Sequence, residues 1–238
     1  MTLQAVLVKK LRNPNSIILV SIATLLNSAQ AQPPANSGCA HHPKQGYHRS
    51  FEDAKKWAKK FDDPSRDKWQ KPEDVITALK IGSTDKIADI GAGTGYFSLR
   101  IARAYPAATV YAADVEPGMV EYLKNQTAEK SLPNHKPIKI PADRPSLPAR
   151  VNLVLIVDTY HHIDNRTSYF QALRKKLLPD ARVAIIDFTA ESPEGPPPEH
   201  RISKADVQDE MRMAGYSIDQ DISLLPYQYF LTFRPLKD

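Results

Sequence analysis

Residues 87–102, with the sequence IADIGAGTGYFSLRIA, constrain the fold of this 238-residue chain more than any other stretch. The apolar residues Ile87, Ala88 and Ile90 are typical of a buried parallel strand, and the spacing of the apolar residues after the glycines is typical of a helix. Gly91, Gly93 and Gly95 alternate in the loop between them. Glycine lets a backbone turn tightly and approach a ligand closely, and the amide groups at the start of a helix favour a carboxylate or phosphate. The stretch therefore predicts a ligand-binding loop between a strand and a helix.

The spacing of the glycines narrows the choice of ligand. A dinucleotide fingerprint has two residues between its second and third glycines, whereas this chain has one. With Asp89 in front, the run DIGAGTG resembles motif I of the class I S-adenosylmethionine (SAM) dependent methyltransferases. The next predicted strand ends at Asp114, where an acid can accept hydrogen bonds from both ribose hydroxyls of a nucleotide. The resemblance implies SAM as the cofactor, and a structural turn followed by a surface acid is the alternative.

The same resemblance assigns parts of the cofactor to residues of this chain. Asp89 and the backbone of the glycine loop would hold the methionine part, and Asp114 would bind the ribose. Val115 and Met119 would pack on the adenine, and Asp143 would accept its amino group, with a surface ion pair as the alternative for Asp143. The cofactor-binding candidates are Asp89, Gly91, Gly93, Gly95, Asp114, Val115, Met119, Asp143 and Asp158.

The rest of the chain alternates predicted strands and helices. A helix that begins after Ser203 leads to two final strands, which we expect to meet at Pro226 as a hairpin. This order fits an α/β, doubly wound, Rossmann-like fold with a seven-stranded, mostly parallel sheet and a C-terminal β-hairpin. The expected strands after the glycine loop are 109–114, 137–140, 151–157, 181–188, 218–225 and 227–233, and the expected helices are 117–129, 165–178 and 203–214.

Residues 51–80 are predicted to form a helical cap on a SAM-binding core at 81–238. Apolar residues at helical spacing indicate one helix over 51–61, and a second helix begins near Pro72. Methyltransferases of this class commonly carry such helices over the substrate. Arg66 and Lys68 could recognise an acidic substrate, although solvated surface charge is the default expectation.

The segment DTYHH at 158–162 directly follows the central strand, where ligands bind in a doubly wound sheet. His161 and His162 are the main catalytic candidates, because histidine titrates near neutral pH and can take a proton from a hydroxyl, a thiol or an activated carbon acid. If the backbone is extended there, only one of them can point into the pocket, and the other would cap the next helix or bond the backbone. Tyr160 could lie on the cofactor or the substrate, or pack in the core.

The first 31 residues resemble a signal peptide. Three basic residues precede an apolar run at 17–26, and Ala-Gln-Ala follows at 29–31. Removal of this segment takes away three positive and no negative charges, so the formal net charge falls from +5 to +2. We expect an exported or periplasmic protein, with an inner-membrane anchor or a cytoplasmic protein as the alternative. SAM is made in the cytoplasm, so an exported enzyme would need a supply of it.

Residues 32–50 are predicted to be a flexible linker rich in proline and histidine. Cys39, His41, His42 and His48 could be read as a metal tract, but a flexible segment seldom makes a closed site, and we predict no metal. Cys39 is the only cysteine, so no internal disulfide can form. The residues before Cys39 fit a lipid-attachment site poorly, because Asn36 stands where an apolar residue is expected.

Absent motifs narrow the methyl acceptor. Amino-group DNA methyltransferases carry Asn or Asp followed by Pro-Pro and an aromatic residue after the fourth strand, and arsenite methyltransferases use several cysteines; this chain has neither pattern. The chain resembles the small-molecule group, which includes quinone-biosynthesis C-methyltransferases and many O-methyltransferases. Residues 51–72 and the proline-rich loop at 191–200 resemble an exported bacterial branch of that group.

We therefore predict methyl transfer to an oxygen, carbon or sulfur atom of a small molecule, with no nucleic-acid partner and no membrane contact beyond a possible N-terminal anchor. A SAM- or nucleotide-binding module without transferase activity stays open as the alternative, because an intact cofactor motif does not prove turnover. A nicotinamide-dependent oxidoreductase is a more distant alternative.

Overall fold

The computed structural model describes Gly46, Phe51 and residues 53–237. The predicted signal peptide lies outside the described residues, as does the predicted linker apart from Gly46. The predictions made for these two segments, including location, therefore stay predictions. Within the described part of the chain, no helix is both long and apolar enough to cross a membrane.

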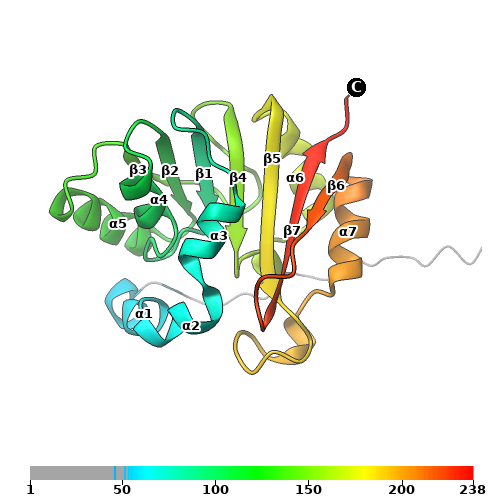
Figure 1. Cartoon of the computed structure of the whole chain (residues 1–238), viewed down its shortest axis with the longest axis horizontal. Coiled ribbons are helices and arrows are strands. Elements are labelled where there is room, and N and C mark those ends of the chain that lie inside the picture. Colours follow the sequence, from blue (N-terminus) through cyan, green and yellow to red (C-terminus); the bar gives the residue numbers. More distant parts are fainter. Residues whose placement is uncertain (1–45, 47–50, 52, 238) are drawn as a thin grey trace, which may run out of the picture. The chain divides into compact units, whose positions relative to one another are not determined.

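Seven strands of the described residues form one sheet (Figure 1). They are β1 (Lys86–Ile90), β2 (Thr109–Asp114), β3 (His135–Lys139), β4 (Val151–Val157), β5 (Leu177–Phe188), β6 (Tyr216–Asp221) and β7 (Gln228–Pro235). Their order is β3-β2-β1-β4-β5-β7-β6. The first five strands run parallel to one another, whereas β7 is antiparallel to both β5 and β6. The predicted Rossmann-like fold with a mostly parallel sheet and a C-terminal hairpin is confirmed.

Helices cover both faces of this sheet. They include α3 (Pro72–Ala78), α4 (Ser98–Ala104), α5 (Pro117–Glu129), α6 (Arg166–Arg174) and α7 (Lys204–Met213). Strand β4 shows why two apolar cores form, because successive side chains of a strand point to opposite faces. Val154 and Ile156 pack into the core that α6 and α7 cover, whereas Leu153 and Leu155 pack into the core that α3 and α4 cover. A strand buried on both faces is apolar throughout, as residues 151–157 are.

The segment before β1 forms a cap. It contains α1 (Ala54–Phe61), a short 3-10 helix η1 (Pro64–Arg66), α2 (Asp67–Gln70) and then α3. Figure 1 shows α1 and α2 beyond the carboxyl end of β4. Both helices predicted for this segment are present, whereas η1 and α2 were missed because helices of three and four residues are too short to show an apolar period.

Several element boundaries differ from the prediction, most clearly between α6 and β5 and in the C-terminal hairpin. Helix α6 ends at Arg174 and β5 begins at Leu177, both earlier than expected. The pairing of β4 with β5 has a register shift, and Pro179 lies within it. Proline cannot donate a backbone hydrogen bond, but it is tolerated at such an irregularity, so β5 can begin before it. The final two strands are joined by residues 222–227 and not by a tight turn at Pro226.

A buried polar cluster ties the chain after β4 to α6 and α7. The Arg166 guanidinium donates from Nε to Oε2 of Glu210 at 2.6 Å and from a terminal nitrogen to Oε1 at 2.8 Å. The Tyr160 hydroxyl donates to Glu210 Oε2 at 2.6 Å, and the Tyr160 ring stacks on Phe170 with the ring centres 5.4 Å apart. Burial raises the pKa of Tyr160 well above its usual value, so Tyr160 stays a neutral donor. The cluster fixes the position of the histidines that follow Tyr160.

We expect Glu210→Ala to lower the free energy of unfolding by about 3 kcal/mol, because it leaves the buried Arg166 charge without its carboxylate. Urea denaturation of the two proteins measures the difference. The control is Glu121→Ala, since the Glu121 side chain is 64% exposed and its loss should change stability by no more than about 0.5 kcal/mol. Equal effects of the two substitutions would contradict the role given to the cluster.

Candidate cofactor and acceptor site

A cleft of about 450 Å³ lies at the carboxyl ends of the central strands, beneath the cap. Its floor is the glycine loop between β1 and α4 and the residues that follow β2 and β4. Its walls are the cap and residues 194–196 of the proline-rich loop. The volume is in the range of small-molecule sites, and the position is the one at which doubly wound sheets bind ligands.

Each glycine of the loop has a backbone conformation that favours glycine, and the space around the three differs. All three have positive φ, of +78° at Gly91, +56° at Gly93 and +90° at Gly95. A Cβ at Gly91 would lie 2.3 Å from Thr159 Oγ1, so the loop packs directly against the segment after β4. A Cβ at Gly95 would collide with leucine side chains of α4 and α5, whereas the nearest atom to one at Gly93 is 3.7 Å away, on Phe61 of the cap. The backbone at Gly93 therefore faces space between loop and cap.

Asp114 joins the end of β2 to the glycine loop. Its Oδ2 accepts the Gly93 N–H at 2.8 Å, and its Oδ1 accepts the Glu116 N–H at 2.9 Å. A carboxylate oxygen has two acceptor positions, so each oxygen keeps one for a further donor. This geometry fits the two neighbouring hydroxyls of a ribose, the role that the sequence predicts. Burial raises the pKa of Asp114, while these backbone N–H groups lower it.

Asp89 lies under the glycine loop at the bottom of the cleft and is only 3% exposed. Burial, and next the neighbouring Asp114 carboxylate, raise its pKa to about 7, against hydrogen bonds from Ser98 that lower it. A cation bound nearby would favour the ionised form of Asp89. The N–H groups of Gly91 and Gly93 are already bonded, to Ala113 O and to Asp114, so the loop offers carbonyl oxygens at these positions. Carboxylate and carbonyls together suit a positively charged ligand group.

The other predicted cofactor residues divide into two groups. Val115 and Met119 line the cleft beside Asp114. Asp143 does not line the cleft. Its exposed carboxylate pairs with Arg144 at 3.1 Å, which is the surface ion pair that the sequence left open as the alternative to adenine binding.

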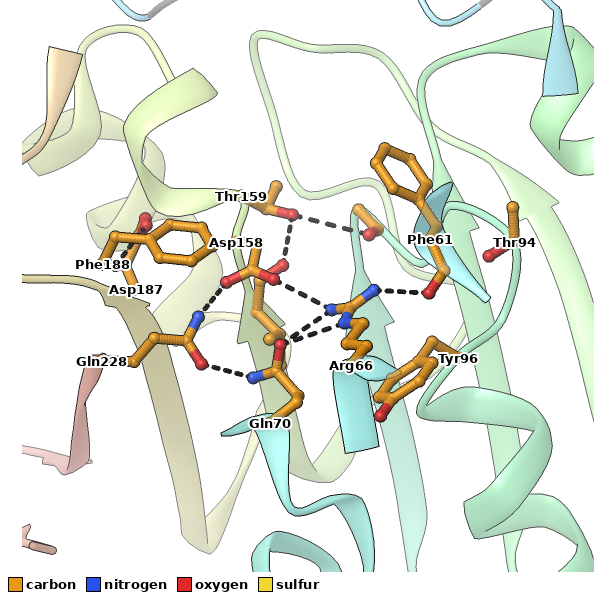
Figure 2. A network of polar contacts seen from close by, with 12 residues as sticks. Phe61, Arg66, Gln70, Thr94, Tyr96, Asp158, Thr159, Asp187, Phe188 and Gln228 are labelled. Atoms are coloured by element: carbon orange, nitrogen blue, oxygen red, sulfur yellow. Dashed lines mark hydrogen bonds and ion pairs between the residues drawn. The ribbon is translucent and has the colours of Figure 1, made fainter. Parts of the chain in front are cut away.

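Asp158, also predicted to bind the cofactor, is engaged with the cap (Figure 2). Its Oδ2 accepts from Arg66 at 2.9 Å, and its Oδ1 accepts from the side-chain amide of Gln228. Gln70 completes a closed set of hydrogen bonds, because it accepts from Arg66 at 3.0 Å and donates to Gln228 at 2.5 Å. Arg66 also donates to the Phe61 carbonyl at 3.0 Å. Burial raises the pKa of Asp158 to about 7, and the positive charge of Arg66 opposes this rise.

The default expectation of solvated charge is therefore wrong for Arg66, whose side chain is 13% exposed. The sequence offered Arg66 only as a possible contact to an acidic substrate, and Gln228 was not predicted as a site residue, because nothing in the local sequence marks partners that are up to 158 positions apart.

Further polar contacts join the cap to the glycine loop itself. The Thr94 hydroxyl donates to Asp62 Oδ1 at 2.7 Å, and the Tyr96 hydroxyl donates to Asp67. The guanidinium carbons of Arg66 and Arg100 lie 4.0 and 4.1 Å from the centre of the Tyr96 ring, within cation–π range. The loop predicted to bind the cofactor and the cap above it are thus one connected structure.

Both candidate histidines line the cleft. They lie in a 3-10 turn, η2 (Tyr160–His162), so the restriction expected for an extended backbone does not apply. His161 is 3% exposed, and its Nδ1 lies 2.9 and 2.8 Å from the two carboxylate oxygens of Asp187. Burial lowers the pKa of His161, but the carboxylates of Asp187 and Asp158 raise it by more, so the pKa lies above its usual value. The centre of the His162 ring lies 4.2 Å from that of His161.

Asp187 fixes the orientation of His161. Besides His161 Nδ1, its carboxylate accepts the backbone N–H of His161 at 3.2 Å and that of Phe188 at 2.8 Å. With Nδ1–H held by a carboxylate, the neutral imidazole presents Nε2 as its proton acceptor. Asp187 was not predicted as a site residue, although an acid near the carboxyl end of β5 lies beside the end of β4 in a parallel sheet.

Tyr160 does not line the cleft, because it is fully buried with its hydroxyl on Glu210. Among the described residues no group of three or more His, Cys, Asp or Glu side chains could hold a metal ion.

Residues 88–183 match a family model described as a methyltransferase domain. A malonyl-[acyl-carrier protein] O-methyltransferase of Hahella chejuensis is 30% identical over 114 residues, which are 47% of this chain and 39% of that protein. The chain thus matches well under half the length of this curated relative.

Solved structures match more of the chain. A SAM-dependent methyltransferase from Aquifex aeolicus is 27% identical, with a TM-score of 0.71 over 76% of this chain and 97% of that one. A mitomycin 7-O-methyltransferase is 14% identical, with a TM-score of 0.59 over 75% of this chain and 60% of that one. An O-methyltransferase of neocarzinostatin biosynthesis, solved with S-adenosyl-L-homocysteine (SAH), is 12% identical, with a TM-score of 0.62 over 72% and 55%. The last two likenesses show the fold alone. The chain therefore has the fold of the class I SAM-dependent methyltransferases, and its residues 88–183 match the methyltransferase-domain model.

Proposed function

We propose that this protein is a SAM-dependent methyltransferase that acts on a small-molecule acceptor. The observation that carries the proposal is the Asp114 carboxylate, which lines the cleft, accepts the N–H groups of Gly93 and Glu116, and keeps one acceptor position on each oxygen. The matched methyltransferase domain and the Aquifex relative support the same conclusion. SAM is the cofactor.

The chain's own residues suggest how SAM lies in the cleft. Asp114 binds the ribose hydroxyls, and Val115 and Met119 pack beside the adenine. Asp89 and the carbonyls of the glycine loop hold the cationic methionine end. Asp143 is left out of this arrangement because its exposed carboxylate pairs with Arg144.

When bound, SAM supplies a methyl group on a positively charged sulfur, which becomes a neutral thioether once the methyl group has moved to the acceptor. The protein's task is then to align the acceptor, exclude water and take up the acceptor's proton. The cap excludes water, because Asp158, Thr94 and Tyr96 hold it over the cleft. His161 takes the proton at Nε2 from an oxygen, sulfur or carbon acid, and Asp187 stabilises the imidazolium that results.

For the location, the sequence of the first 31 residues supports export as the working proposal, with an anchored or cytoplasmic protein as the alternative. Fractionation of cells that express the full chain, followed by mass determination of the mature N-terminus, decides between them.

A screen of small-molecule acceptors with methyl-labelled SAM tests the proposed activity. Transfer of label to at least one acceptor is the expected result. Tight SAM and SAH binding without transfer to any acceptor would instead favour a binding module.

We expect Asp114→Ala to weaken SAM and SAH binding by more than about a hundredfold, because it removes two charge-assisted hydrogen bonds of about 1.5–3 kcal/mol each. Isothermal titration calorimetry measures both affinities. The matched control is Asp143→Ala, whose exposed carboxylate lies outside the cleft, and its affinities should equal those of the wild type. Equal weakening by both substitutions would contradict the placement of the ribose.

We expect SAM binding to tighten severalfold between about pH 6 and about pH 8, because Asp89 has a pKa of about 7. Below that value the carboxyl is protonated and neutral, and above it the negative charge attracts the cationic cofactor. Titration calorimetry across this range measures the change. Asp89→Asn should bind with little pH dependence, and an unchanged slope in that variant would contradict the role of Asp89.

We expect His161→Ala to lower turnover about a hundredfold or more while leaving SAM affinity unchanged, because a positioned general base contributes about 10²–10⁴ in rate. Asp187→Asn should lower turnover in the same direction, since it stabilises the imidazolium less. The control is His200→Ala, because His200 lies outside the residues that line the cleft. If His161→Ala retains full turnover and His162→Ala does not, His162 is the base.

A further inference from the structure

Besides Tyr96 and Phe97, which follow the glycine loop, aromatic side chains line the cleft in two groups. The cap group is Phe51, Trp57 and Phe61, in which Trp57 stacks on Phe61 with ring centres 5.3 Å apart. The second group is Trp69 and Phe188, whose ring centres are 6.0 Å apart. Figure 2 shows Phe61 and Phe188 on opposite sides of Asp158.

The two groups differ in what they contact. Phe61 lies over the glycine loop, within 3.7 Å of where a Cβ of Gly93 would be, and the Phe51 ring lies 5.5 Å from that of His162, so the cap group extends from the glycine loop to the second histidine. Phe188 follows Asp187 directly in β5 and donates its N–H to that carboxylate at 2.8 Å. The second group therefore lies at the His161 end of the cleft, where the proton of an acceptor would be taken.

The proline-rich loop holds the Phe188 ring in place. Gly195, with φ of +95°, packs so closely that a Cβ there would lie 2.5 Å from the Phe188 ring. Gly195 and Pro196 line the cleft next to this ring. A rigid ring, and not a flexible aliphatic chain, thus forms this wall.

The charged residues near Trp69 and Phe188 do not favour an ionic ligand. Arg66, the cation nearest to Trp69 among the interactions described, has its guanidinium 5.8 Å from that ring but is bonded to Asp158 and Gln70. The other charged residues that line the cleft include both signs, as Lys60 and Glu194 show. This wall consists of the faces and edges of two aromatic rings, which bind a flat aromatic compound better than a saturated one.

We propose that Trp69 and Phe188 form the acceptor subsite, and that its ligand is a planar aromatic compound with an ionisable ring hydroxyl that points toward His161. The ring packs on Trp69 and Phe188, and the hydroxyl donates to His161 Nε2. The methylation of this compound rests on the proposed function, but its binding does not.

Titration of the full chain, saturated with SAH, with nitrocatechol tests the subsite. Its saturated counterpart, cyclohexanediol, and a panel of one- and two-ring phenols are titrated in parallel by calorimetry. Nitrocatechol or another planar phenol is expected to bind, and the saturated diol to bind roughly tenfold more weakly, because aromatic packing accounts for about a factor of three to ten.

Substitutions locate the binding site. Trp69→Ala should weaken phenol binding severalfold and Trp69→Phe should largely restore it, whereas SAH affinity stays unchanged in both. Tyr111→Ala removes a ring outside the cleft and serves as the control. The absorbance of bound nitrocatechol reports its ionisation, which should occur at a lower pH in the wild type than in His161→Ala.

Two results would overturn the subsite: equal affinity for the diol and the phenols, or no phenol binding at about 1 mM by protein that binds SAH. Phenol binding that is lost in Trp69→Ala, in a protein that binds neither SAM nor SAH, would support the subsite and overturn the proposed function.

Discussion

The ion pair between Arg66 and Asp158 is the contact on which the architecture of the site depends. It joins the cap to the end of the central strand, and the amides of Gln70 and Gln228 complete the hydrogen bonds of both charges. Two charges withdrawn from water gain little net stability from each other, but the loss of either one leaves the other buried and uncompensated. Such a pair therefore specifies a single position of the cap more than it adds to the stability of the fold. Arg66 also reaches the Tyr96 ring, so the same side chain sets the cap against the glycine loop.

Four carboxylates meet near this point, and each is used differently because its neighbours differ. Asp114 accepts backbone N–H groups, Asp158 accepts an arginine and an amide, and Asp187 accepts a histidine. Burial, and next the Asp114 carboxylate, raise the pKa of Asp89 to about 7, whereas Asp158 reaches about the same pKa although Arg66 opposes the rise. This division leaves Asp89 as the carboxylate whose charge a bound cation would change most.

Local sequence determined what could be predicted. The strand, glycine loop and Asp114 lie within 28 residues, and their roles follow from glycine conformation and strand order. The apolar run of β4 likewise reveals a strand buried on both faces. Asp187 and Gln228 escaped notice because they reach the site only through the order of the strands in the sheet. Arg66 was considered as a contact to an acidic substrate or as surface charge, but its pairing with Asp158 could not be predicted, because the two residues are far apart in the sequence. Tyr160 and Asp143 show the converse, since a plausible place in the sequence did not bring either side chain into the cleft.

Strand β7 lies between β5 and β6, although it is the last strand of the chain. The sheet therefore cannot grow outward in the order of synthesis, because β6 has no partner until β7 inserts beside β5. Gln228, the first residue of β7, supplies the amide that binds Asp158. The hydrogen bonds that join the cap to Asp158 are therefore complete only after distant segments of the chain have met, and such contacts form slowly in folding. A partly folded chain with a formed glycine loop would still lack the complete cleft, so cofactor binding reports on the folding of the whole domain.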